Sequence, residues 1–140
     1  TPNRLAQYRA RLSGPLLDRI DLHVDVAPVR YRDLSAEPAG ETSKVVRARV
    51  LAARERQRFR FAASTTTCNA EMSGRELRRF ARPDPAGATI LERTMSRLGL
   101  SARAYTRVLK VARTIADLDA AESLGAAHVA EAVQYRSLDR

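Results

Sequence analysis

The alternation of apolar and polar positions along this chain predicts a series of amphipathic helices. The clearest one lies between Ser101 and Asp119, where apolar residues recur at the spacing of a single helix face. That face carries Tyr105, Val108, Ala112 and Ile115, and a neighbouring stripe carries Arg103, Arg107 and Lys110. We expect the apolar stripe to lie in a packed core.

Capping residues divide much of the remaining chain into further helices. The predicted helices run from Thr42 or Ser43 to about Phe61, from a capping box at Ser73–Glu76 to Phe80, from Asp84-Pro85 to Gly99, and from Ala126 to about Arg136, the last with Val129, Ala130 and Val133 facing inward. Together with the helix that follows Ser101, they predict a small helical bundle over residues 42–140.

The first 41 residues have a different pattern. A short helix is predicted from Gly14 to about Ile20, and strict alternation over residues 21–26 is typical of a strand. A lone strand cannot satisfy its own backbone groups, so we expect its sheet to lie in a part of the protein that this segment lacks. Prolines and a glycine between residues 28 and 40 favour a linker, which we place at residues 31–41.

Composition supports a mainly α fold and a polyanionic partner. Apolar residues make up 44% of the 140 residues but aromatic residues only 5%, a balance that favours packed helices over a sandwich or barrel. The 25 Lys and Arg residues against 16 Asp and Glu give a net charge of +9, and arginine suits phosphate groups. The chain has no apolar run long enough for a membrane span and no secretory signal, so we expect a cytoplasmic protein.

Arg103 is the first candidate for chemistry. It falls in the first turn of its predicted helix, where the helix dipole disfavours a cation unless an anion lies opposite. A helix start and an arginine together make a plausible phosphate site. The alternative is a solvated arginine, or one paired with Glu122 or another acid.

Arg19 is the second candidate. It lies between Asp18 and Asp21, so its simplest interpretation is a local ion pair. The functional interpretation is an arginine that offers charge to a phosphate on a neighbouring subunit. No metal-ligand cluster and no phosphate-binding glycine loop occurs in the sequence, so no residue is assigned to a metal.

The predicted helix from Lys44 to Arg60 is strongly basic, with Glu55 as its single acid. Its cations are spread around much of the helix, which favours a solvated helix over a nucleic-acid contact. Both interpretations stay open. A basic helical module that binds nucleic acid is therefore a second hypothesis for the chain, and a protein-interaction bundle is a third.

Three blocks of sequence resemble a known family, the Mg-chelatase-like AAA+ ATPases of the ComM/YifB type. They are YRARLSGPLLDRIDLHV at residues 8–24, SARAYTRVLKVARTIADL at residues 101–118 and HVAEAVQYR at residues 128–136. Both long blocks occur in the family's order and near its spacing. The resemblance implies that residues 1–30 are the tail of an α/β ATPase core and residues 42–140 its helical lid.

The resemblance also implies roles for the two arginines. Arg19 falls on the family's arginine finger, which reaches ATP on the adjacent subunit, and Arg103 on its sensor 2, which reaches the γ-phosphate held by its own subunit. It further implies ATP and Mg²⁺ as cofactors of the parent protein, a hexameric ring of identical subunits, and a possible role in DNA branch migration during competence. The family's nucleotide-binding motifs are missing from these residues, so we expect the isolated chain to be inactive.

Overall fold

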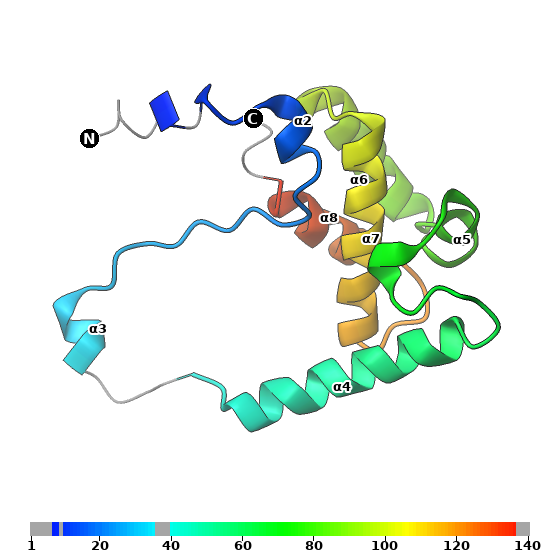
Figure 1. The fold of residues 1–140 in the computed structure, drawn as a ribbon, viewed down its shortest axis with the longest axis horizontal. Helices are drawn as coiled ribbons and strands as arrows, with labels where there is room; N and C mark the ends of the chain where they lie inside the picture. Colours follow the sequence, from blue (N-terminus) through cyan, green and yellow to red (C-terminus); the bar gives the residue numbers. More distant parts are fainter. Residues whose placement is uncertain (1–6, 9, 36–39, 137–140) are drawn as a thin grey trace.

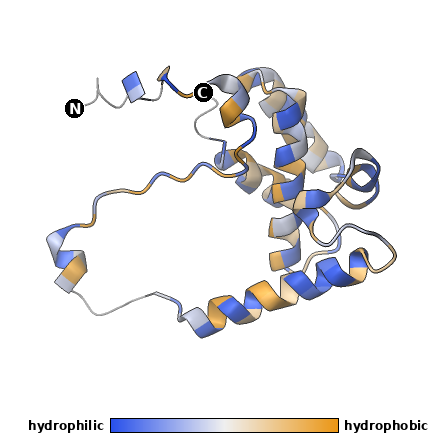
Figure 2. Ribbon diagram, in the orientation of Figure 1, coloured by the Kyte–Doolittle hydropathy of each residue, from blue (hydrophilic) through white to orange (hydrophobic). Residues whose placement is uncertain are grey.

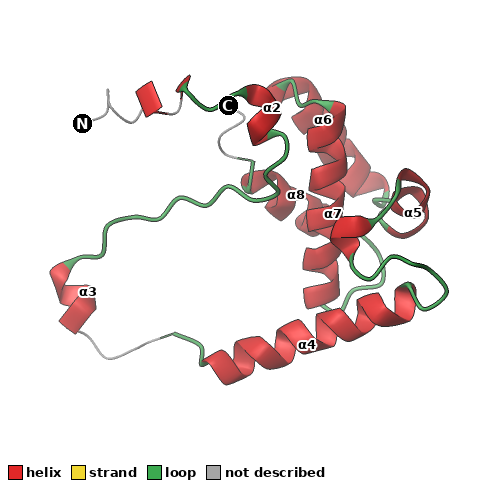
Figure 3. Cartoon of the chain, viewed as in Figure 1, coloured by secondary structure: helices red, strands yellow, loops and turns green. Residues whose placement is uncertain are grey.

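A computed structural model describes residues 7–8, 10–35 and 40–136 of the 140-residue chain (Figure 1). Its α-helices are α2 (Gly14–Leu17), α3 (Tyr31–Ser35), α4 (Ser43–Arg60), α5 (Gly74–Phe80), α6 (Pro85–Leu98), α7 (Ala102–Leu118) and α8 (Ala126–Gln134), and a 3-10 turn, η1, spans Asn69–Glu71. The mainly helical class is confirmed. No strand occurs among the described residues (Figure 3).

The predicted helix starts in the bundle are confirmed because their caps are formed locally. Thr42, Ser73, Asp84 and Ser101 each precede a helix, and each side chain accepts a hydrogen bond from a backbone N–H in the first turn. Ser73 and Glu76 form the predicted capping box. Gly99 ends α6 with a φ of 58°, a left-handed conformation that glycine adopts without steric cost.

Helix α7 lies at the centre of the bundle, where it contacts α4, α5, α8 and η1. Of its predicted stripe, Val108 and Ala112 are buried, Ile115 is partly buried and Tyr105 is 38% exposed. The buried surface extends to Leu109 and to the side of the helix that carries Arg113, because neighbouring helices cover α7 from several directions. In α8, the predicted inward residue Val129 is fully buried.

The core joins residues from every helix between α5 and α8 and from the connecting loops. It consists of Phe61, Met72, Leu77, Ala81, Leu91, Val108, Leu109, Ala112, Ala116, Leu124, Val129 and Ala132. Phe61 also packs edge-to-face against Phe80, with ring centroids 5.7 Å apart. The hydrophobic effect of this cluster provides the main driving force that holds the bundle together.

A buried polar cluster fixes α4 against α7. Both oxygens of the buried Asp117 carboxylate accept from Arg60, Oδ2 at 2.8 Å from Nη1 and Oδ1 from Nη2. Asn69 Nδ2 donates to Oδ2 at 2.8 Å, and Arg113 Nη2 lies 3.2 Å from Oδ1. Burial is the main cause that lowers the pKa of Arg113, against the opposing effect of Asp117. Arg60 is therefore not part of the solvated basic surface predicted for this helix.

The predicted strand over residues 21–26 is not formed. These residues are extended without a neighbouring strand, and His23 N donates a single backbone hydrogen bond to Tyr135 O at 2.8 Å. A strand requires a ladder of such bonds, which no described segment provides here. The short helix is confirmed in part, because α2 ends at Leu17 instead of near Ile20.

Beyond His23 the chain leaves the bundle (Figure 1). Residues 24–30 carry apolar side chains into solvent, with Val24 67% and Val26 88% exposed (Figure 2). Within the predicted linker at 31–41, residues Tyr31–Ser35 form α3, while 36–39 lie outside the described residues. The first half of α4 also projects past α7, which leaves Val46 and Val50 partly exposed.

Candidate phosphate-contact site

The first turn of α7 carries Arg103 on the surface of the bundle. Ser101 caps this turn, because its hydroxyl accepts from Ala104 N at 3.1 Å. Arg103 is exposed, and its guanidinium makes no hydrogen bond or ion pair with any described residue. A pairing with Glu122 is not formed, since Glu122 follows the opposite end of the same helix. The guanidinium is thus available to an anion from outside the chain.

The segment after α2 is attached to the same end of α7. Ser101 Oγ donates to Asp18 Oδ2 at 2.8 Å, and Arg107 Nη1 donates to Asp21 Oδ1 at 2.6 Å. Both acids that flank Arg19 in the sequence therefore bind α7. These contacts link two segments that are more than 80 residues apart, so the sequence pattern did not indicate them.

Arg19 is exposed, and its guanidinium has no partner among the described residues. The local ion pair with Asp18 and Asp21, the simplest interpretation of the sequence, is not formed, because those carboxylates bind Ser101 and Arg107 instead. The Asp18–Ser101 contact brings together the residues next to both candidate arginines, so Arg19 and Arg103 belong to the same end of the bundle.

Arg136 completes the attachment and was not singled out by the sequence. It is buried, and its guanidinium donates to the backbone carbonyls of Ile20 and, at 3.4 Å, Leu17. The preceding residue, Tyr135, accepts the bond from His23 N. The two residues that follow α8 thus hold residues 17–23 against the bundle, in addition to the contact with Ser101. An arginine at a predicted helix end gives no signal of such a role.

The other basic residues of α4 fall into two groups. Arg49 pairs with Glu41 at 2.9 Å and Arg58 with Glu55 at 3.1 Å, both on the surface. The Arg49 guanidinium lowers the pKa of the Glu41 carboxyl by hydrogen bonding and charge. A second group makes no ion pair with the described residues and is exposed: Lys44, Arg47, Arg54 and Arg56.

The described residues contain no group of histidine, cysteine and acidic side chains that could bind a metal ion. The same part of the chain has no helix long and apolar enough to cross a membrane. Cys68 is a partly buried free thiol. At the start of α7, Arg19 and Arg103 present exposed positive charge.

Comparison with known proteins identifies the family. The model described as "Magnesium chelatase, subunit ChlI C-terminal" matches residues 40–136, well over half of the chain. The chain belongs to the magnesium chelatase ChlI family. A second model of that family, "Magnesium chelatase, subunit ChlI", matches residues 1–34.

Proteins similar to this chain occur in several bacteria. The chain is 44% identical to the uncharacterized protein YifB of Escherichia coli and 40% identical to the competence protein ComM of Haemophilus influenzae, in both cases over its full length. An uncharacterized protein of Mycobacterium tuberculosis is 42% identical over 93% of the chain. The chain spans about a quarter of the length of these relatives, 26% to 27%. The resemblance inferred from the sequence blocks is confirmed.

Proposed function

We propose that this chain is the C-terminal part of an ATPase, in which it supplies two arginines to bound ATP. In this proposal Arg19 is the arginine finger that reaches ATP on the adjacent subunit, and Arg103 is the sensor 2 residue that reaches the γ-phosphate on its own subunit. The observation that supports it best is that both guanidiniums are exposed and unpaired among the described residues, although acids lie next to Arg19 in the sequence.

The residues present fit this role. ATP supplies the transferable phosphoryl group, and Mg²⁺ neutralises part of its charge; fixed positive charge from the protein stabilises the rest. Arg103 would hold a phosphate at the positive end of α7, and Arg19 would add charge from its attachment beside Ser101. Because Asp18 and Asp21 are engaged by α7, neither neutralises Arg19 directly.

The same proposal gives the chain its place in a larger protein. Residues 1–30 are the tail of the α/β core, residues 31–41 a linker and residues 42–140 the helical lid. The proposal includes a hexameric ring of identical subunits in the cytoplasm, in which the arginine finger of one subunit reaches the ATP of the next. The ComM relative is named a competence protein, which favours a motor that acts on DNA, with branch migration as its reaction.

The test is made in the full-length parent protein. Arg19→Ala is expected to lower ATP turnover by about 10³-fold or more while nucleotide binding is kept, and Arg103→Ala to lower turnover together with nucleotide affinity. Arg97→Ala, an exposed arginine on α6 without an ion pair among the described residues, is the matched control. Turnover that is unchanged in both test variants would remove the proposed roles.

A second measurement addresses the chain by itself. Without the core it is expected to bind ATP only weakly, since it has no glycine loop to hold the phosphates. Calorimetric titration with a non-hydrolysable ATP analogue and Mg²⁺ measures this affinity. Micromolar binding would show a nucleotide site within these 140 residues and contradict the proposal that the chain only supplies two arginines to ATP bound by the core.

A further inference from the structure

Helix α5 and the turn that follows it carry an unusual concentration of arginine. Arg75, Arg78, Arg79 and Arg82 are all exposed, and none forms an ion pair with a described residue. Arg75, Arg78 and Arg79 lie on α5 itself and Arg82 in the turn that follows it, so the arginines are spread around the helix: Arg78 and Arg82 line one hollow and Arg79 another. The one acid of α5, Glu76, is occupied by the Ser73 backbone N–H and the hydroxyls of Ser64 and Thr66. Such a cluster attracts anions.

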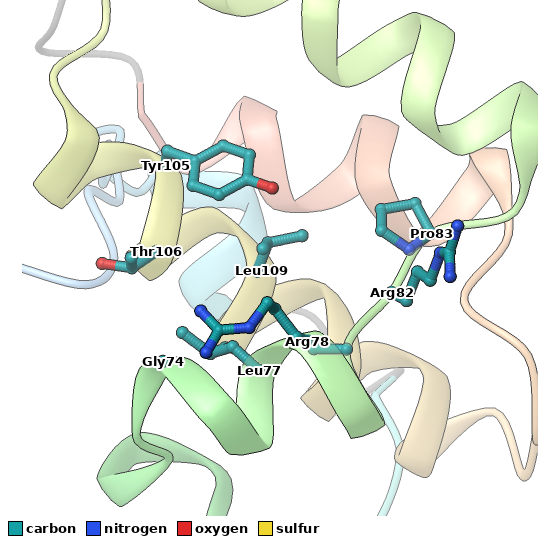
Figure 4. A pocket seen from close by; sticks show the side chains of 9 residues that line it. Gly74, Leu77, Arg78, Arg82, Pro83, Tyr105, Thr106 and Leu109 are labelled. Atoms are coloured by element: carbon teal, nitrogen blue, oxygen red, sulfur yellow. The ribbon is translucent and has the colours of Figure 1, made fainter.

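A pocket of about 360 Å³ borders this cluster on the side that faces α7 (Figure 4). Its buried floor is apolar and consists of Leu77, Ala81 and Leu109. Tyr105 and Thr106 line it from α7, and Arg78 and Arg82 line it from α5 and the turn that follows (Figure 4). The pocket therefore combines an apolar floor and an aromatic ring with two unpaired guanidiniums.

A second, shallower hollow borders the other side of α5. It is lined from α5 by Arg79, whose guanidinium lies 4.8 Å from the centre of the Phe80 ring, and from α4 by Arg56 and Phe59. Phe59 is 87% exposed. Two acids also line this hollow: Glu55, which is bound by Arg58, and Glu122. An aromatic ring held in solvent beside arginines has no evident role in the bundle's own packing.

We propose that α5 is crossed by single-stranded nucleic acid, whose phosphates bind Arg78, Arg79 and Arg82 and whose bases lie against Tyr105 on one side and Phe59 on the other. Arginine forks match phosphate oxygens, and exposed aromatic rings stack on unpaired bases of any sequence. A duplex keeps its bases stacked and leaves the aromatic rings unused. An acidic peptide would use the arginines but has no repeated flat rings to match Tyr105 and Phe59.

This surface is distinct from the proposed ATP contacts at Arg19 and Arg103. The inference rests on the DNA-directed part of the proposed function and not on the roles of those two arginines. Failure of the two proposals can therefore be distinguished: one is measured as ATP turnover in the parent protein, and the other as nucleic-acid binding by this chain.

The test is fluorescence anisotropy of a labelled oligothymidylate with the 140-residue chain at low salt. The double variant Arg78→Glu/Arg82→Glu is expected to weaken binding at least tenfold. The matched control, Arg93→Glu/Arg97→Glu on α6, changes the net charge equally at another exposed site and is expected to change affinity by less than threefold. Circular dichroism checks that both variants keep their helices.

Two further measurements distinguish a single strand from a duplex and from an acidic polypeptide. Phe59→Ala is expected to weaken binding to the single strand about fivefold while binding to a duplex of the same length is unchanged. Poly-glutamate of equal charge is expected to compete poorly. Absence of binding, equal losses in the two double variants, a duplex preference, or equal competition by poly-glutamate would each overturn the proposal.

Discussion

The bundle and the extended segment before it use the same kinds of apolar residue with opposite results. In the bundle, Leu124 and Val129 are buried almost completely, and buried charges find partners within the chain. Between residues 24 and 35, valines, Tyr31 and Leu34 lie in solvent. From α5 to α8 the bundle thus contains partners for its buried apolar residues, whereas the first half of α4 leaves Val46 and Val50 partly exposed. The alternating pattern of residues 21–26 requires a neighbouring strand that no described segment supplies.

Among the changes considered, removal of Asp117 is expected to lower the stability of the bundle most. Asp117→Ala leaves the buried Arg113 and the partly buried Arg60 without their shared carboxylate, which costs about 3–5 kcal/mol in the free energy of unfolding. Urea denaturation followed by circular dichroism measures the loss. Glu92→Ala, at an exposed acid on α6, is the control and is expected to stay within about 0.5 kcal/mol of the parent chain. Similar losses in both variants would contradict a buried role for Asp117.

Matched leucine truncations compare the two regions directly. Leu124→Ala removes a side chain that is 1% exposed and is expected to destabilise the chain by about 2–5 kcal/mol through a cavity in the core. Leu34→Ala makes the same chemical change at a side chain that is 70% exposed and is expected to change stability by no more than about 0.5 kcal/mol. Thermal unfolding measures both. A loss at Leu34 as large as that at Leu124 would mean that residues 24–35 pack in solution.

The smallest expected effect concerns the loop before α5, which polar contacts hold in place. Hydrogen bonds from the Ser73 backbone, Ser64 and Thr66 lower the pKa of Glu76 from 4.5 to about 2. Because the folded carboxyl binds its proton more weakly than the unfolded one, its contribution to stability is present above pH 4.5 and is lost as the pH falls towards 2. Glu76→Gln is expected to flatten the decline in stability over this interval.

Unfolding free energies measured between pH 2 and 5 test this expectation. Glu92→Gln serves as the control, because Glu92 makes no hydrogen bond with the described residues. A Glu76→Gln chain whose stability falls as steeply as that of the parent would show that these hydrogen bonds do not lower the carboxyl's pKa.

The sequence predicts those features of the fold that depend on near neighbours. The N-caps Ser73, Asp84 and Ser101 bind backbone groups within the next turn, so these residue types predict where the helices begin. Burial of Arg113 and Asp117 was not predicted, because a charged residue on a helix ordinarily faces water. Their environment depends on Arg60, which lies 57 residues from Asp117 in the sequence.

The candidate site shows the same limit. The two arginines were selected from the sequence, and both are exposed. The acids beside Arg19 bind Ser101 and Arg107, because residues 18–21 pack against the start of α7. These partners are more than 80 residues away in the sequence, so a local pattern does not predict them. Arg136 was missed for the same reason, because its acceptors are backbone carbonyls more than 110 residues away.

The Ser101 hydroxyl serves two purposes at once, since it accepts from the first turn of α7 and donates to Asp18. Any displacement of residues 18–21 relative to the bundle must break that bond or carry the first turn of α7 along. A movement of residue 19 is therefore coupled to the orientation of residue 103. In the ring proposed above, that coupling would link the helical bundle of each subunit mechanically to the boundary with its neighbour.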